Sequence, residues 1–245
     1  MQPSLFAPVR RLTAADACAN AVRQAIVSGR LSPGVRLPPE RTLATELGVN
    51  RVTLRSALHQ LVAEGLIHQR QGQGTTVLDW RWAGGPGLLG AVIDTQADGA
   101  ASVRAVSDLL AVRRALAVVV LEQLSGHGGP LDGVRAAVVG FEAVATAAEP
   151  DLNALAEADL AVIASLLEAT GSPVLPLCLH PVARALAELP ALRAAVYRAP
   201  LSNLAGWHAT LTWLESGGVG PSRQQLLDLL AARDAETLAQ MSAPQ

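Results

Sequence analysis

The spacing of apolar residues divides the chain into two parts. Up to about residue 78, short amphipathic segments are broken by turn residues, whereas beyond residue 100 Ala, Leu and Val dominate long segments with helical spacing. In the first part, Cys18, Val22 and Ile26 lie four residues apart and Gly29 follows them. This pattern predicts a helix that starts near Thr13 and ends before the glycine.

Two further short helices are predicted close together in the first part. One begins near Pro38 and ends at Gly48, and the next follows the N-cap residue Asn50. Two short helices joined by a tight glycine turn are typical of a helix-turn-helix. The apolar face of the second of these helices is predicted to consist of Leu54, Leu58, Leu61 and Val62.

The remaining pattern predicts a wing, a linker and a helical bundle. Gly72-Gln73-Gly74 separates two extended segments within residues 66–78, as in a two-stranded hairpin. We therefore expect a mainly α protein with a winged helix-turn-helix over residues 1–78, a linker and first connecting helix over 79–100, and an all-helical bundle over 101–245. The helices predicted in the bundle span 103–124, 131–147, 151–169, 173–189, 201–216 and 222–242.

Composition and charge narrow the classes of protein. Half of the residues are hydrophobic, which excludes a disordered chain, and no apolar run reaches the roughly 20 residues of a membrane helix. No secretory signal opens the chain, so we expect a cytoplasmic protein. All 19 basic residues are arginine, and they are unevenly placed: residues 1–78 carry a net charge of +5 and the rest −7. A basic first part indicates an anion-binding module.

The third predicted helix has the residues that a DNA-reading helix needs. Arg51 and Arg55 lie four apart near its start, off the leucine face, where arginine can donate two hydrogen bonds to guanine in the major groove. Thr53 and the first amides of the helix suit phosphate oxygens. Arg36 and Arg41 are expected close to the DNA backbone. The alternative is that these arginines only form a solvated basic surface.

At these residues the chain resembles the winged helix-turn-helix of the GntR family of bacterial transcription regulators. The resemblance implies that Arg41, Arg51 and Arg55 contact the operator, and that the wing tip, residues Gln71, Gly72, Gln73 and Gly74, reaches the minor groove. Asn50 stands where the family often has Ser or Thr. The similarity covers residues 21–78 and includes Ile26-Val27-Ser28-Gly29-Arg30-Leu31-Ser32-Pro33-Gly34, Leu37-Pro38-Pro39-Glu40-Arg41-Thr42-Leu43-Ala44, Gly48-Val49-Asn50-Arg51-Val52-Thr53-Leu54-Arg55 and Gly72-Gln73-Gly74-Thr75.

Three polar residues interrupt apolar stripes in the second part. Arg113, Asp159 and His208 each lie on a different predicted helix among leucines and valines at helical spacing. Because a buried charge is costly unless it is paired, these residues indicate one polar pocket inside the bundle. An alternative is a structural ion pair of Arg113 with Asp159 and a separate core histidine.

The second part resembles the FadR branch of GntR regulators, whose sensor domains are of the FadR C-terminal and FCD types. The similarity lies in residues 108–116, in Ala158-Asp159-Leu160 and in residues 169–175. Many FCD domains hold a metal through one Asp and three His. Here only Asp159 and His208 stand at such positions, Ile163 replaces one histidine, and the last falls near Arg233. We therefore expect no bound metal and no cofactor.

Together these features predict a homodimeric repressor that binds a short palindromic operator in double-stranded DNA. Its helical part is expected to bind a small organic acid or an acyl-CoA-type effector through Arg113, Asp159 and His208. The alternative is a ligand-independent architectural DNA-binding protein. An enzyme is not expected, because the sequence offers no glycine-rich phosphate loop, no nucleophile elbow and no complete metal set.

Overall fold

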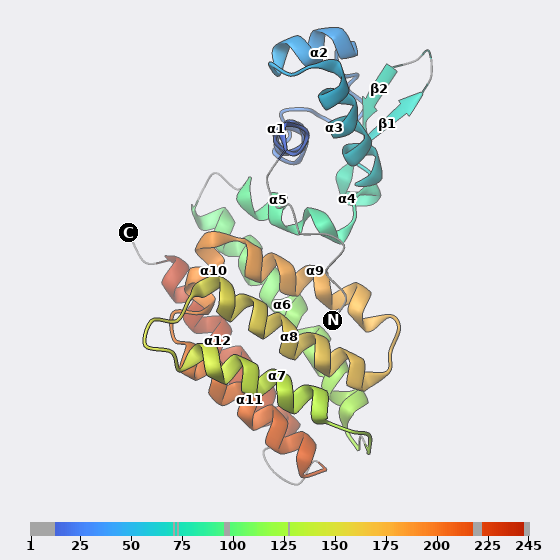
Figure 1. Ribbon diagram of the computed structural model, residues 1–245. Helices are drawn as coiled ribbons and strands as arrows, with labels where there is room; N and C mark the ends of the chain where they lie inside the picture. The colour runs from blue at the N-terminus through green and yellow to red at the C-terminus, as the bar shows by residue number, and fades with distance from the viewer. Residues whose placement is uncertain are drawn as a thin grey trace, which may run out of the picture. The chain divides into compact units, whose positions relative to one another are not determined.

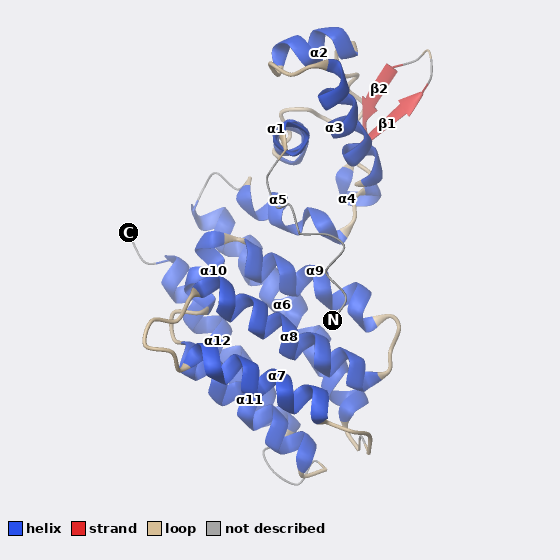
Figure 2. Cartoon of the chain, viewed as in Figure 1, coloured by secondary structure: helices blue, strands red, loops and turns tan. Residues whose placement is uncertain are grey.

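The computed structural model describes residues 13–70, 72, 74–95, 99–126, 128–217 and 222–242. The chain divides into two compact units, Met1–Thr95 and Gln96–Gln245. Helices dominate both units, and the described strands belong to the first, which confirms the predicted fold class (Figure 1, Figure 2). No helix among the described residues is both long and apolar enough to cross a membrane.

The N-terminal unit is a helix-turn-helix followed by a hairpin. Its first three helices are α1 (Ala14–Val27), α2 (Glu40–Glu46) and α3 (Arg51–Ala63). Strands β1 (Ile67–Arg70) and β2 (Gly74–Val77) then pair antiparallel, from Ile67 opposite Val77 to Arg70 opposite Gly74. The sequence prediction of three helices and a wing is therefore confirmed.

Local signals define where these helices begin and turn. Thr13 and Asp16 form a capping box at the start of α1, in which each side chain bonds the other residue's backbone N–H. The Asn50 side chain accepts a bond of 2.8 Å from the Thr53 amide and caps α3. Gly48 has a φ of +65°, a conformation that suits glycine, and this allows the tight turn between α2 and α3.

A single apolar core holds these helices and the hairpin together. Leu54, Leu58 and Leu61 of α3 are essentially inaccessible to solvent and pack with Ile26 of α1. Val62, which the sequence pattern placed on this buried face, is 39% exposed instead. The reason is geometric: at about 100° per residue, the buried residues Leu54, Ala57, Leu58 and Leu61 define the inward direction, and Val62 lies at the edge of the arc that they cover.

The segment after the hairpin packs with the N-terminal unit. It contains the short helices α4 (Trp80–Ala83) and α5 (Leu89–Asp94), with the 3-10 helix η1 (Pro86–Leu88) between them. Leu88 is buried in the core of this unit, and α5 packs against α1. Gly65 has φ +72°, and a Cβ there would lie 2.0 Å from the Ala83 carbonyl oxygen, so only glycine allows this close approach.

The C-terminal unit is a bundle of helices. They are α6 (Gly99–Leu124), α7 (Asp132–Ala145), α8 (Leu152–Thr170), α9 (Leu175–Glu188), α10 (Pro190–Val196), α11 (Pro200–Glu215) and α12 (Arg223–Ser242). Helix α7 packs on α8 and α11, and α6 packs on α12, α9 and α8 (Figure 1).

Six of these helices correspond to the spans predicted from the sequence, and α10 does not. Its seven residues are too few to give a periodic apolar signal. Pro190 stands at its first position, where the missing N–H of proline costs nothing, so the chain ends α9 and begins a new helix there.

Candidate functional site

The N-terminal unit exposes the start of α3. Arg51 and Arg55 are both exposed, and the Arg55 Nε donates to the Glu40 Oε2 at 2.8 Å. Glu40 lies in the first turn of α2, so this ion pair links the two helices of the helix-turn-helix. Sequence reasoning missed Glu40 as a partner of Arg55, because a contact across 15 residues leaves no local pattern.

A groove runs between the segment before α2 and the hairpin. Arg36, Glu40, Arg70, Gly72 and Gly74 are among the residues that line it. The predicted backbone-contacting residue Arg36 and the two wing glycines therefore lie on one surface. Gly72 and Gly74 both have positive φ, as the tip of the hairpin requires. Gln71 and Gln73, also predicted at the wing tip, lie outside the described residues.

The other predicted DNA-contacting residues have different surroundings. Arg41 is exposed on α2, close to Glu40 in sequence. The Thr53 side chain is half-buried, and its amide is already bonded to the Asn50 cap. Because that amide donates to the cap, Thr53 can offer DNA its hydroxyl group only, and Asn50 acts mainly by stabilising the first turn of α3.

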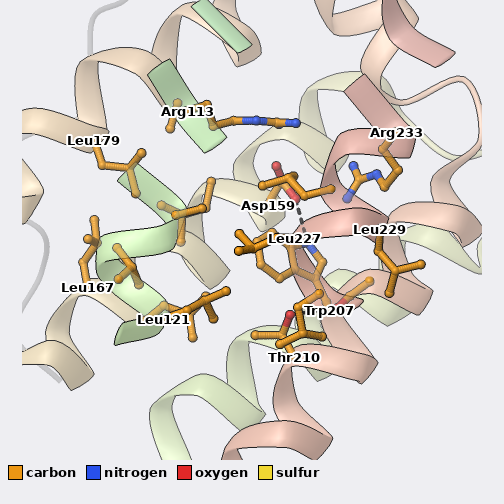
Figure 3. A pocket seen from close by; sticks show the side chains of 18 residues that line it. Arg113, Leu121, Asp159, Leu167, Leu179, Trp207, Thr210, Leu227, Leu229 and Arg233 are labelled. Atoms are coloured by element: carbon orange, nitrogen blue, oxygen red, sulfur yellow. Dashed lines mark hydrogen bonds between the residues drawn. The ribbon is translucent and has the colours of Figure 1, made fainter. Parts of the chain in front are cut away.

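The C-terminal unit contains a cavity of about 120 Å³ between α6, α8, α9, α11 and α12. Most of its lining is aliphatic and comes from these helices, with Leu121, Leu167, Leu179 and Leu227 among the residues (Figure 3). Its charged groups, Arg113, Asp159 and Arg233, gather at one end in the close-up. The cavity can hold several water molecules or the apolar part of a small ligand.

Asp159 is held by neutral donors. Its carboxylate is 8% exposed and accepts a bond of 2.9 Å from the Tyr197 hydroxyl and one of 2.7 Å from the Trp207 Nε1. These two donors come from the end of α10 and from α11. The alternative of a direct Arg113–Asp159 ion pair is not what the structure shows, because Arg113 pairs with another carboxylate.

That carboxylate is Asp234 of α12, which is 1% exposed. It forms ion pairs with both Arg113 and Arg114 of α6. The Arg113 side chain is 14% exposed, and its Nε is buried without a hydrogen-bond partner in the described structure. Asp234 thus connects α6 to α12 and positions Arg113 at the cavity.

Arg233 lines the same cavity without a direct partner. Among the residues that the structure describes, its guanidinium makes no hydrogen bond and no ion pair within 4.0 Å. Desolvation lowers the pKa of Arg233, and the negative charge of Asp159 partly opposes this effect. The cluster has two carboxylates, Asp159 and Asp234, and three arginines. The third arginine, Arg114, is 35% exposed, so solvent screens the one positive charge in excess.

His208 lies outside this pocket, which corrects the sequence prediction. Its side chain is 46% exposed and its Nε2 lies 3.5 Å from the Glu142 Oε2 of α7. Trp207 and Thr210 of the same helix line the cavity instead. Gly206, Trp207 and Thr210 define the side of α11 that lines the cavity, and at about 100° per residue His208 lies nearly opposite their mean direction.

The residues at this end of the cavity do not form a metal site. No group of three or more His, Cys, Asp or Glu that could hold a metal occurs in the described parts of the chain. Asp159 is the one carboxylate in the lining, both of its oxygens accept hydrogen bonds, and Ile163 lies one turn further on in the lining. Two arginines beside a single carboxylate fit an anion better than a cation.

Comparison with known proteins identifies the N-terminal unit. Residues 14–77 match the family model described as bacterial regulatory proteins, gntR family. This match spans most of the winged helix-turn-helix, which is therefore similar to the DNA-binding domain of that family. An uncharacterized HTH-type transcriptional regulator of Mycobacterium tuberculosis is 40% identical over 92 residues, which is 38% of each chain. The mannosyl-D-glycerate transport/metabolism system repressor MngR of Escherichia coli is 48% identical over 63 residues, 26% of each chain.

The matches concern part of each relative's length. The putative L-lactate dehydrogenase operon regulatory protein of Escherichia coli is 47% identical over 73 residues, 30% of this chain and 26% of that one. The similarity thus spans less than two fifths of these curated relatives. The GntR family and these relatives are named as regulators, not as enzymes.

A solved structure has a similar fold over nearly the whole chain. It is that of Lar, described as controlling the expression of the Listeria monocytogenes agr system, with a TM-score of 0.60 and 16% identity. The match covers 96% of this chain and 98% of that one. At this identity the likeness concerns the fold alone, a helix-turn-helix unit followed by a helical unit.

We predict that Tyr197 does not ionise while the helical unit is folded. Burial and, second, the negative charge of Asp159 raise the pKa of its phenol far above the usual value. The resulting stability is fully present below the unfolded-state pKa of about 10 and is lost as the pH rises toward the folded-state pKa. Because this is the chain's only tyrosine, tyrosinate absorbance in an alkaline titration reports it directly. Tyrosinate formed near pH 10 in a folded chain would contradict the prediction.

We predict that Asp234→Asn destabilises the fold by about 3–5 kcal/mol, because it leaves two arginines without their buried carboxylate. Urea unfolding followed by circular dichroism measures the change. Asp228→Asn is the matched control, since Asp228 is an exposed residue of the same helix that accepts only a bond from the neighbouring Gln224. Equal unfolding midpoints for the two variants would show that the Asp234 ion pairs contribute nothing.

Proposed function

We propose that this protein is a DNA-binding transcription regulator controlled by a small anionic effector. The observation that carries the first half of the proposal is the GntR domain at residues 14–77, with the arginines of α3 exposed. A regulator of this kind acts on the bacterial chromosome and therefore in the cytoplasm. Its DNA-contacting residues are Arg36, Arg41, Asn50, Arg51, Thr53, Arg55, Gly72 and Gly74, with Gln71 and Gln73 at the wing tip.

The start of α3 is the part that enters the major groove in this proposal. Arg51 and Arg55 would each reach guanine, whose O6 and N7 accept two bonds from one guanidinium. The groove lined by Arg36, Gly72 and Gly74 would follow the phosphate backbone, where arginine gives affinity without sequence preference. We propose a homodimer, in which two such domains read the half-sites of a short palindrome.

The cavity of the C-terminal unit supports the second half of the proposal. Two arginines and one carboxylate, Arg113, Arg233 and Asp159, line the cavity, and an anion near Arg113 and Arg233 would offset the cost of desolvating the guanidinium groups. The aliphatic remainder of the cavity suits a ligand with an apolar part. A small organic acid fits these dimensions best, and an acyl-CoA would place only its acyl chain inside.

Control by such a ligand requires two states of the regulator that bind the effector differently. A ligand shifts an equilibrium only by its differential affinity for the two states, and the coupling acts in both directions. Effector binding at Arg113 and Arg233 would therefore change operator affinity, as expected of a ligand-responsive repressor. A ligand-independent architectural protein would show no such coupling, and the cavity with Arg113 and Arg233 in its lining favours the regulator.

We predict that Arg51→Ala weakens binding to the specific operator by about 1–3 kcal/mol, the usual cost of losing a bidentate base contact. A gel-shift titration against an operator selected from random duplexes measures this. Arg184→Ala is the control, because it removes the same charge from an exposed position of α9. Unchanged affinity of the Arg51 variant would exclude the proposed role of α3.

We predict that Arg113→Ala and Arg233→Ala each abolish the effector response and leave operator binding intact. A thermal-shift screen of small carboxylates, acyl-CoAs and divalent metals first identifies a stabilising compound, since a ligand that binds the native state raises the melting temperature. Arg113→Ala also removes a partner of Asp234, so Arg233→Ala is the cleaner test.

Arg223→Ala serves as the control for the effector experiment, because Arg223 lies on the same helix but pairs at the surface with Glu122. Calorimetry should show undiminished effector binding for this variant. Equally tight binding to the Arg233 variant would refute the anion site, and a chain that no compound in the screen stabilises would favour the architectural alternative.

A further inference from the structure

Val52 is an apolar residue in an unexpected place. It belongs to the first turn of α3 and is 80% exposed, more than any other large aliphatic residue that the structure describes. Its neighbours in sequence are Arg51 and Thr53, both of which can form hydrogen bonds. Val52 therefore contributes almost nothing to the core of the N-terminal unit, and burial within the chain does not explain it.

The core of the unit determines which way Val52 points. Leu54, Ala57, Leu58 and Leu61 are buried and set the inward side of α3. With about 100° between successive residues, Val52 lies almost directly opposite the mean direction of these four side chains. It thus occupies the centre of the outward face of the first turn.

The residues around Val52 on this face are polar. Arg55 and Ser56, the nearest positions one turn further along, are exposed. The Arg55 guanidinium is held at 2.8 Å by Glu40, on the α2 side of the face. Val52 is therefore an apolar residue on a surface that otherwise forms hydrogen bonds. Helix propensity does not explain it either, because a β-branched residue stabilises a helix less than alanine does.

The major groove of DNA contains an apolar group that an exposed valine can contact. The edges of the base pairs there carry hydrogen-bonding groups, and the C5-methyl group of thymine is the apolar one. We propose that Val52 reads a thymine in each half-site of the operator by packing against its C5-methyl group. This inference rests on the proposed DNA-binding function, and it adds a sequence preference that the arginines cannot supply.

Removal of the methyl group tests this contact directly. The operator selected from random duplexes is resynthesised with deoxyuridine in place of thymidine at one symmetric pair of positions at a time. Uracil keeps the hydrogen-bonding edge of thymine and loses only the methyl group. We expect one pair of positions at which the full chain binds about fourfold more weakly per methyl removed, the effect of losing one buried methyl contact.

Substitution of the protein completes the test. Val52→Ala should bind the thymine and uracil operators with equal affinity, whereas Val62→Ala should keep the full discrimination. Val62 is the matched control, since it is an exposed valine near the other end of the same helix. Both changes are at exposed positions, so the melting temperatures should equal that of the unmodified chain.

The outcomes distinguish failure of the inference about Val52 from failure of the proposed DNA-binding function. If the chain selects an operator but no thymine position responds to methyl removal, or if Val52→Ala retains the discrimination, the inference about Val52 is overturned while the regulator stands. If the chain selects no sequence from random duplexes, the proposed function itself fails.

Discussion

The packing of α12 on α6 in the C-terminal unit depends on the ion pairs of the buried Asp234 carboxylate. Asp234 joins α12 to α6 through Arg113 and Arg114, and Arg233, the residue before it, lines the cavity. Asp159 needs no arginine, because neutral donors satisfy its oxygens. Asp234 alone thus pairs with two arginines, and Arg113 and Arg233 line the cavity beside Asp159. This arrangement is the reason for proposing an anionic effector.

In the N-terminal unit, the apolar core determines which side of α3 faces inward. Leu54, Leu58 and Leu61 hold α3 against α1, and the opposite side of α3 must therefore face solvent or DNA. Glu40 then restrains Arg55 by an ion pair between exposed groups. Such pairs contribute little to stability, so the effect of Glu40 is to orient the arginine.

The elements that the sequence predicted are those that depend on residues close together in the chain. Asn50, Gly48 and the leucines of α3 predicted the helix-turn-helix, because caps, turns and helical faces depend on residues a few positions apart. The structure brings Arg113 and Asp159 to one cavity, and the signal for both was a charge on an apolar stripe. His208 does not line this cavity, because the side of α11 that carries Leu204 and His208 is not the side that lines it, and His208 lies beside Glu142 of α7.

The sequence by itself determined the order and type of most elements, the DNA-binding motif and the uneven distribution of charge. The tertiary structure alone decided the pairings: Arg113 with Asp234 rather than Asp159, and Arg55 with Glu40. The 121 residues between Arg113 and Asp234 explain the difference. Helical periodicity is set by neighbouring residues, whereas a buried ion pair depends on how distant helices pack, which no local pattern records.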